Sequence, residues 1–216
     1  VGVVTLTGLG LKFSSIIISY AGGSLLLTAI YTALIVWVIG LAVPVTASYI
    51  ISAVIAAPAL IMLGVPDYAA HMFVFYYAIL SEVSPPTALS CFAAAALTGG
   101  NPYRTTIYAW KYTLPAFVVP FMFVLDPKGV GLLLKGPPMD VIWIVVTSFI
   151  GLTALAGGVE NWLFKKTTLY ERLLLIAGGF LLIYPVALYD AVGILLVAAA
   201  IASQKFRKPS PEQAAT

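Results

Sequence analysis

The sequence predicts an all-α protein that crosses a lipid bilayer several times. Hydrophobic residues make up 62% of its 216 residues, only 9% are charged, and the mean hydropathy is +1.06. Because soluble domains carry about 25% charged residues, water cannot surround most of this surface. Long apolar runs alternate with short segments rich in glycine and proline. Helices are the expected spanning elements, since they satisfy their own backbone hydrogen bonds in lipid.

Composition also excludes several kinds of function. The chain has a single cysteine, Cys91, and a single histidine, His71, so it can form neither an intrachain disulfide nor a bis-histidine haem or zinc centre. It carries no glycine-rich phosphate loop, no Ser-His-Asp signature and no convincing carboxylate pair. We therefore predict no enzyme activity and no cofactor. The net charge of +3 does not indicate nucleic-acid binding, since the basic residues lie mostly in short loops and the tail.

Two apolar segments, residues 24–41 and 45–63, follow an apolar opening. The chain starts at Val1 without methionine or a basic segment, which is expected of a piece of a longer membrane protein rather than of a signal peptide. The connection between the two segments contains no charge, whereas two full spans normally need a polar turn in water. We predict a re-entrant hairpin over 24–63 whose tip lies inside the protein; an ordinary helical hairpin with a short loop is the alternative.

Residues 69–98 are long enough to cross a bilayer but are interrupted near their middle by Ser84-Pro85-Pro86. Two consecutive prolines remove two amide donors and clash with the preceding turn, so a continuous helix is disfavoured there. Glu82 lies just before the break, and an ionisable residue at membrane depth is a candidate for function. The alternative is a proline kink that only shapes packing.

The rest of the chain is predicted to form a C-terminal membrane region and a tail. Asp67 and Asp190 are expected to cap the helices that they precede. The tail, 204–216, is polar and expected to be disordered. The elements before it are an interfacial segment at 103–111, a span at 112–125, a turn-rich loop at 126–140, a span at 141–158, a polar link at 159–172, and two short helices within 173–203.

The distribution of basic residues predicts the orientation of this region. The cluster at 205–208 flanks the last apolar run, so we expect the C-terminus to lie in the cytoplasm. The cluster at 165–172 should share that side, which requires an even number of crossings between the two. This requirement is why 173–203 is interpreted as two helices that turn near Pro185. The loop 126–140 is then external, although it also carries lysines.

The hairpin tip and the helix break together form the candidate binding site. Each contains proline, hydroxyl side chains and backbone groups that a continuous helix would have paired. Carbonyls at helix C-terminal ends suit a cation, and amides at helix N-termini suit a substrate carboxylate. The candidate residues are Gly40, Pro44, Thr46 and Ser48 at the tip, and Glu82, Ser84, Pro85, Pro86 and Thr87 at the break.

Hydroxyl oxygens are hard donors of the kind that sodium prefers. The expected Na⁺ ligands are the hydroxyl groups of Thr46, Ser48, Ser84 and Thr87. Taken singly, each hydroxyl is more simply explained by a hydrogen bond back to its own helix, and their clustering at two breaks is what favours a site. Glu82 has three interpretations: a proton carrier, a cation ligand, or an acceptor for amides freed near the break, the last being slightly favoured.

Two stretches of the sequence resemble a known family. The run GLAVPVTASYIISAVIAAPALIMLGV and the later run AAHMFVFYYAILSEVSPPTALSCFAAAALTGGNPYRT are similar to the C-terminal half of the large membrane subunit of TRAP transporters (tripartite ATP-independent periplasmic transporters). The fused-permease type that works with TAXI-family binding proteins is the most similar, and the opening VGVVTLTGLGLKFS and the extension after residue 140 resemble it too. Ser84-Pro85-Pro86 matches the Thr/Ser-Pro-Pro break of the family, and 40–49 matches its second hairpin tip.

The resemblance implies an elevator-type, sodium-driven importer of organic acids in the bacterial or archaeal cytoplasmic (inner) membrane. Its expected partners are a periplasmic substrate-binding protein, a small membrane subunit or its fused equivalent, the N-terminal half of the permease, and membrane lipid. Residues 1–126 would be the second-repeat segment of the transport domain, 127–203 a C-terminal transmembrane extension and 204–216 a cytoplasmic tail. Without the first repeat, the chain alone is expected to be inactive. The alternative is a membrane anchor or assembly subunit that does not transport, and Na⁺ versus H⁺ coupling stays open.

Overall fold

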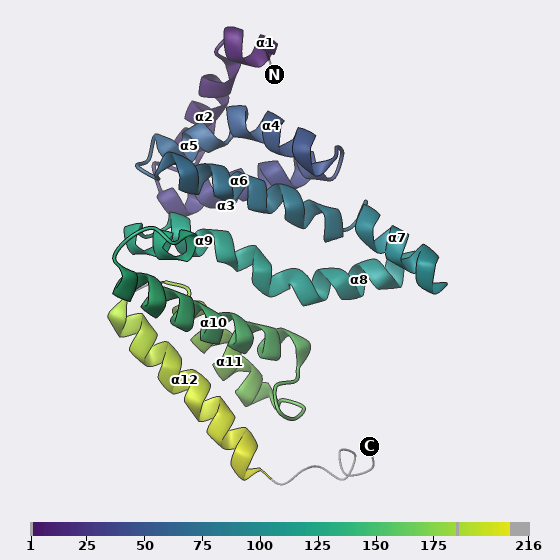
Figure 1. Cartoon of the computed structure of the whole chain (residues 1–216), viewed down its shortest axis with the longest axis vertical. Coiled ribbons are helices and arrows are strands. Elements are labelled where there is room, and N and C mark those ends of the chain that lie inside the picture. Colours follow the sequence, from purple (N-terminus) through teal and green to yellow (C-terminus); the bar gives the residue numbers. More distant parts are fainter. Residues whose placement is uncertain (1, 185, 208–216) are drawn as a thin grey trace.

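The computed structural model describes residues 2–184 and 186–207, and over these residues the chain is helical apart from its turns. It confirms the predicted all-α class: the described residues form no named strand, and an isolated bridge joins Trp162 and Lys166. Figure 1 shows α1 to α7 gathered toward one end of the long axis, α8 and α9 crossing the middle, and α10 to α12 at the other end. The helices of the first group are α1 (Gly2–Leu6), α2 (Leu9–Tyr20), α3 (Leu25–Gly40), α4 (Val45–Ile55), α5 (Ala57–Ile61), α6 (Asp67–Leu80) and α7 (Leu89–Thr98).

The predicted hairpin is formed by α3, α4 and α5. The Ser24 hydroxyl caps α3 by accepting a hydrogen bond from the Leu27 amide at 3.4 Å, and residues 41–44 form the tight tip before α4. The second arm divides at Ala56, where α4 ends and α5 begins. With 16 and 11 residues, α3 and α4 are about 24 and 16 Å long. Each is shorter than the roughly 30 Å hydrocarbon core of a bilayer, but α5 lengthens the second arm, so helix length does not distinguish a re-entrant hairpin from an ordinary one.

The structure confirms the predicted helix break. Helix α6 tightens into a 3-10 turn, η1 (Ser81–Val83), and at Ser84 the backbone becomes extended. Helix α7 begins after Ala88, which takes a left-handed conformation with φ of 38°. The prediction for Asp67 was wrong: Pro66 occupies the capping position and α6 starts at Asp67, with no side-chain cap bond. A proline there already fixes the dihedral that a helix entry needs.

The predicted division into an interfacial piece at 103–111 and a separate span at 112–125 was also wrong. Helix α8 (Pro102–Thr113), the 3-10 turn η2 (Leu114–Val118) and α9 (Val119–Val124) follow one another without a gap, and together they form one candidate span of 23 residues, Pro102–Val124. Pro115 and Pro120 are the second residues of η2 and α9. Near the start of a helix the backbone N–H has no partner within the helix, so a proline there costs no hydrogen bond. The backbone therefore narrows into a 3-10 turn and continues as a helix.

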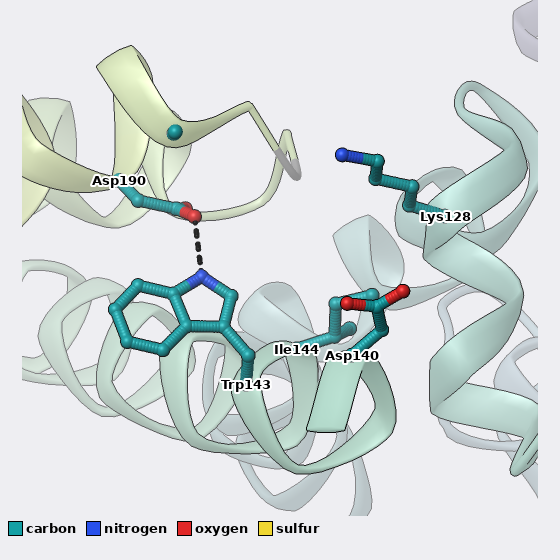
Figure 2. A pocket seen from close by; sticks show the side chains of 6 residues that line it. Lys128, Asp140, Trp143, Ile144 and Asp190 are labelled. Atoms are coloured by element: carbon teal, nitrogen blue, oxygen red, sulfur yellow. Dashed lines mark hydrogen bonds between the residues drawn. The ribbon is translucent and has the colours of Figure 1, made fainter. Parts of the chain in front are cut away.

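Three helices form the C-terminal bundle: α10 (Pro138–Glu160), α11 (Leu169–Leu181) and α12 (Ala187–Phe206), preceded by the 3-10 turn η3 (Pro127–Leu133). Two helices replace the single long span, as predicted for 173–203, but α11 begins earlier, at Leu169, and α12 has 20 residues and is not short. Helix α12 continues through Phe206, so the disordered tail predicted from 204 does not begin there, and residues 208–216 of it lie outside the described residues. Asp190 does not cap α12, because Val186 holds that position. Its carboxylate instead accepts a hydrogen bond from the Trp143 indole N–H at 2.9 Å (Figure 2).

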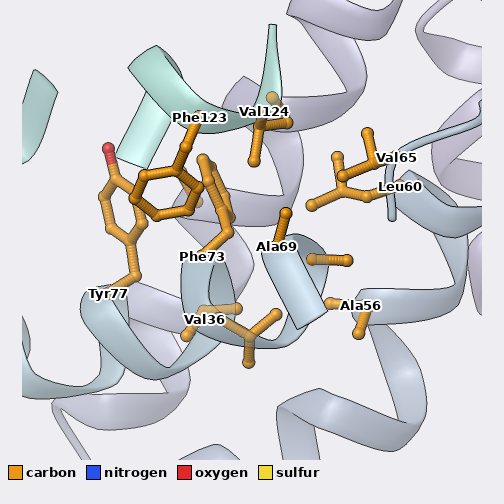
Figure 3. Packing of buried hydrophobic residues seen from close by; sticks show 14 of the residues in the cluster. Val36, Ala56, Leu60, Val65, Ala69, Phe73, Tyr77, Phe123 and Val124 are labelled. Carbon is orange, nitrogen blue, oxygen red and sulfur yellow. The ribbon is translucent and has the colours of Figure 1, made fainter. Parts of the chain in front are cut away.

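Buried apolar side chains form one large core in the first half and smaller cores beyond it. Figure 3 shows α6 at the centre of the large core, with Phe73 and Tyr77 packed against residues of α9. A smaller cluster holds the C-terminal bundle together around Leu175 and Leu182. Met122 of α9 joins Leu155 of α10 and Ile183 in a third cluster, which connects the two halves of the chain.

Candidate ion and substrate site

The hairpin tip and the helix break, about forty residues apart in sequence, line one cavity of about 210 Å³. We call it the tip–break cavity. From the hairpin it is lined by Gly40, Leu41, Ala42, Val43 and Pro44, and from the break by Ser81, Glu82, Thr87 and Leu89. The two regions that the sequence singled out therefore meet in space.

The two regions come close together at Gly40, the last residue of α3. A Cβ atom at this position would lie 2.3 Å from Ser81 Oγ, 2.6 Å from Ser81 Cβ and 3.2 Å from Ser48 Oγ. Rotation of the Ser81 hydroxyl would relieve the first contact but not the second, which involves a fixed atom. Glycine is therefore required for the tip to lie this close to the end of α6.

Four helix ends converge on the cavity. Gly40 and Leu41 lie at the C-terminal end of α3, and Ser81 and Glu82 follow the C-terminal end of α6. Pro44 precedes α4, while Thr87 and Leu89 lie at the start of α7. Helix C-terminal ends carry partial negative charge and helix N-termini partial positive charge. The same small space can therefore attract a cation at one pair of ends and a carboxylate at the other.

The hydroxyl groups at the site fall into two classes. Ser48 is fully buried, and its hydroxyl has no hydrogen-bond partner. Ser84 is equally buried, but its hydroxyl donates to the Leu80 carbonyl at 2.7 Å, and that of Ser81 donates to the Ala78 carbonyl at 2.7 Å. Of the three serine hydroxyls, only that of Ser48 has both its O–H donor and its oxygen lone pairs unused. An unpartnered buried hydroxyl costs about 1–3 kcal/mol, so this group is a natural ligand for a small bound species.

The remaining predicted residues differ in how close they lie to the tip–break cavity. Thr87 is exposed but lines the cavity, and Glu82 is half-buried and lines it too. The Glu82 carboxylate forms no ion pair with any described residue, so it adds uncompensated negative charge beside the site. The other predicted residues are not among the lining residues. Thr46 and Pro86 are exposed, Pro85 is half-buried, and Ser48 and Ser84 are buried behind the lining.

Sequence reasoning missed Ser81. It looks like an ordinary helical serine, and the signal that could have found it is its position directly before Glu82 and three residues before the Ser84 break. Reasoning also missed a row of buried hydroxyls along the hairpin arms. Like Ser48, those of Thr28, Thr32 and Ser52 are buried without a hydrogen-bond partner.

Comparison with known proteins adds one finding. A family model described as "Tripartite ATP-independent periplasmic transporter, DctM component" matches residues 1–128, which is more than half of the 216-residue chain. The chain belongs to the DctM family. Neither curated proteins nor solved structures give a match.

Membership of the DctM family makes this chain part of a transporter permease and not of an enzyme family. Within residues 2–184 and 186–207, three helical segments are long and apolar enough to cross a membrane, Pro102–Val124, Pro138–Glu160 and Ala187–Phe206, and four shorter apolar helices accompany them. The protein is thus a multi-pass membrane protein. The tip–break cavity lies inside the matched region, whereas α10 to α12 lie beyond it.

Proposed function

We propose that this chain is part of a sodium-driven secondary transporter that imports organic acids delivered by a periplasmic binding protein. The tip–break cavity is the binding site in this proposal. The observation that carries it is the meeting of two helix interruptions around one small polar space in a permease of the DctM family. Discontinuous helices with exposed backbone ends are how secondary transporters bind ions and substrates.

The proposal assigns a role to each part of the cavity. Carbonyl groups at the ends of α3 and α6, together with the Ser48 hydroxyl, coordinate Na⁺. The Ser84 and Thr87 oxygens add further lone pairs near the break, and Glu82 holds negative charge beside the ion. The amides at the starts of α4 and α7 receive the carboxylate of the substrate. A bound Na⁺ lies between these groups and offsets the repulsion between Glu82 and an anionic substrate.

The proposed surroundings follow from the family. A periplasmic binding protein presents the substrate, a small membrane subunit or its fused equivalent completes the permease, and the complex lies in the cytoplasmic (inner) membrane. The two basic clusters at 165–172 and 205–207 lie at the same end of the C-terminal bundle, since Lys165 Nζ donates to the Arg207 carbonyl at 2.9 Å. Because basic segments favour the cytoplasm, we place that end and the C-terminus inside the cell.

The decisive experiment restores the helix at the break. In the complete transporter that contains this chain, Pro85→Ala combined with Pro86→Ala should leave the protein folded in the membrane and abolish sodium-driven uptake. A continuous helix would re-pair the carbonyls and amides that the site needs. The measurement is substrate uptake into proteoliposomes, normalised to folded protein, with and without a sodium gradient.

A matched control is Pro58→Ala, which changes a proline at the start of α5, outside the residues that line the cavity. It should retain near-normal uptake. Near-normal uptake by the double variant as well would remove the break from the site and favour a membrane anchor that does not transport. Uptake that persists unchanged with a proton gradient but no sodium would instead overturn the choice of ion.

A further inference from the structure

A second polar pocket lies where η3 meets the C-terminal bundle, and apart from Lys128 its lining residues lie beyond the region that matches the family. Its volume is about 90 Å³, and its lining residues are Lys128, Asp140, Trp143, Ile144, Ala187 and Asp190. Figure 2 shows the side chains of Lys128 and Asp190 reaching toward the same space from opposite sides, with Asp140 and Trp143 on α10 below them. None of these residues lines the tip–break cavity.

The three charged groups of this pocket are not paired with one another. The ion pairs among the described residues are Lys111–Glu160 and Arg207–Glu171, so the ammonium group and both carboxylates remain available to a ligand. Asp190 is only 3% exposed. Its Oδ2 accepts the Trp143 indole N–H, but its Oδ1 has no hydrogen-bond partner. A buried carboxylate oxygen that lacks a donor is unusual and costly, and a ligand that donates a hydrogen bond would complete it.

The pocket lies at one end of two helices of membrane-spanning length. Asp140 is in the first turn of α10 and Asp190 in the first turn of α12, and both helices are candidate spans. Their first turns therefore mark one face of the bilayer. Trp143 is 54% exposed there, and tryptophan favours the level of the lipid headgroups. A ligand of this pocket thus comes from the membrane surface.

We propose that this pocket binds the headgroup of a phospholipid with a primary ammonium group, phosphatidylethanolamine. The ammonium group donates hydrogen bonds to Asp190 and Asp140 beside the Trp143 ring, and the phosphate lies against Lys128. The volume equals about three waters of the liquid, which suits an aminoethyl arm, while the phosphate stays outside near exposed Lys128. A trimethylammonium group is bulkier and has no N–H to donate, so the pocket should discriminate against phosphatidylcholine.

The test counts lipids bound to the purified full chain by native mass spectrometry. Palmitoyl-oleoyl phosphatidylethanolamine should form a saturable one-to-one complex, and the choline lipid with identical acyl chains should bind at least tenfold more weakly. Asp190→Asn keeps an oxygen that can accept from Trp143 but removes the charge, and it should weaken ethanolamine-lipid binding at least tenfold. Asp140→Asn and Lys128→Gln should each weaken it severalfold. The matched control Asp67→Asn changes another carboxylate in the first turn of a helix, and it should bind like the wild type.

Several outcomes would overturn the proposal. Equal binding of the ethanolamine and choline lipids would remove the ammonium group from recognition, and equal binding of phosphatidylglycerol would reduce the site to the charge of Lys128. Displacement of the lipid by free phosphoethanolamine at equal concentration would assign the pocket to a soluble zwitterion. If Asp190→Asn fails to fold, the variants at exposed Asp140 and Lys128 decide: wild-type binding by both contradicts the site.

Discussion

The hairpin arms (α3 and α4) and the end of the C-terminal bundle around Glu171 treat buried polar groups in opposite ways, although the far end of that bundle leaves Asp190 Oδ1 without a partner. In the first, the buried hydroxyls of Ser48 and Ser52 have no partner, and the helices stop where the cavity forms. In the second, buried Glu171 accepts hydrogen bonds from the Thr168 amide at 2.8 Å and the Ser203 hydroxyl at 2.9 Å. The first arrangement leaves binding capacity unused in the free protein, whereas the second uses it for stability.

The two regions also differ in how their helices meet. In the bundle, a Cβ atom at Gly179 would lie 2.8 Å from the Gly151 carbonyl oxygen, and one at Gly178 would lie 3.0 Å from that of Gly193. Such backbone contacts are typical of membrane helices packed through small residues. Between the tip and the break, the close approach at Gly40 is to side-chain atoms of Ser81 and Ser48 rather than to backbone. The bundle helices therefore pack backbone against backbone, whereas the tip meets the break through side chains.

The largest expected effect is on the bundle contact itself. Gly179→Ala would place a Cβ atom 2.6 Å from Leu155 Cγ and 2.8 Å from the Gly151 carbonyl oxygen, so the helices must separate. We expect a loss of about 1–3 kcal/mol in the free energy of unfolding, measured by thermal and denaturant unfolding in detergent. Gly2→Ala, where nothing lies within 4 Å of the new atom, is the matched control. Wild-type stability for Gly179→Ala would contradict the tight bundle.

A smaller effect is expected at Glu171. Burial raises the pKa of this carboxyl group, but hydrogen bonds from Thr168 and Ser203 and the charge of Arg207 outweigh it, so the pKa lies below its ordinary value. A lowered folded-state pKa adds stability that is present above the unfolded value, near 4.3, and is lost as the pH falls through the folded value. Glu171→Gln should therefore lower stability at neutral pH by about 1–2 kcal/mol and flatten the acid limb of the stability curve.

The control for this prediction is Glu160→Gln. The Glu160 carboxylate pairs with Lys111 at 2.9 Å, with 23% and 43% of the two side chains exposed. Exposed ion pairs contribute about 0–1 kcal/mol, so its loss should be the smaller of the two. If Glu160→Gln lowers the free energy of unfolding as much as Glu171→Gln or more, the prediction that buried Glu171 stabilises the bundle more than the exposed pair is contradicted.

The smallest expected changes in stability come from two serine variants, one in the hairpin and one in the bundle. Ser48→Ala removes a buried hydroxyl that has no partner, so stability should stay level or rise by up to about 1 kcal/mol, while uptake should need more sodium. Ser203→Ala removes a hydrogen bond to Glu171. It should lower the free energy of unfolding by about 1 kcal/mol and leave the sodium dependence of uptake unchanged. Parallel unfolding and uptake assays on both variants measure this. The same response from both serines would abolish the distinction between the two regions.

The sequence was sufficient where covalent structure decides the outcome. Two consecutive prolines interrupt a helix whatever surrounds them, so the break at 84–88 was predictable. The two helices within 173–203 were predictable for another reason, because the basic clusters on either side require an even number of crossings. The sequence was insufficient where the effect of a proline depends on its position within a helical turn. Pro115 and Pro120 are the second residues of a 3-10 turn and a helix, and this position allowed Pro102–Val124 to continue without a gap.

The site was predictable as two segments but not as a set of atoms. Ser48, Glu82 and Thr87 were named because they lie at the interruptions. Ser81 was not, because its place beside the tip depends on the approach of Gly40, and its position before Glu82 is only a weak signal. Asp190 shows the same limit. Its partner Trp143 lies 47 residues away in sequence, and no local pattern connects the two.

The glycine contacts of the bundle have a practical consequence for labelling. Because the main chains of α10 and α11 meet at Gly151 and Gly179, the spacing of the helices does not depend on the residues that face outward. Phe149, on α10, is 73% exposed. Its outward face can therefore accept a bulky spin label or fluorophore without moving the helices. Such a probe would report the depth and orientation of the bundle in the bilayer. Because the bundle helices keep their spacing, movement of the hairpin could be measured relative to it.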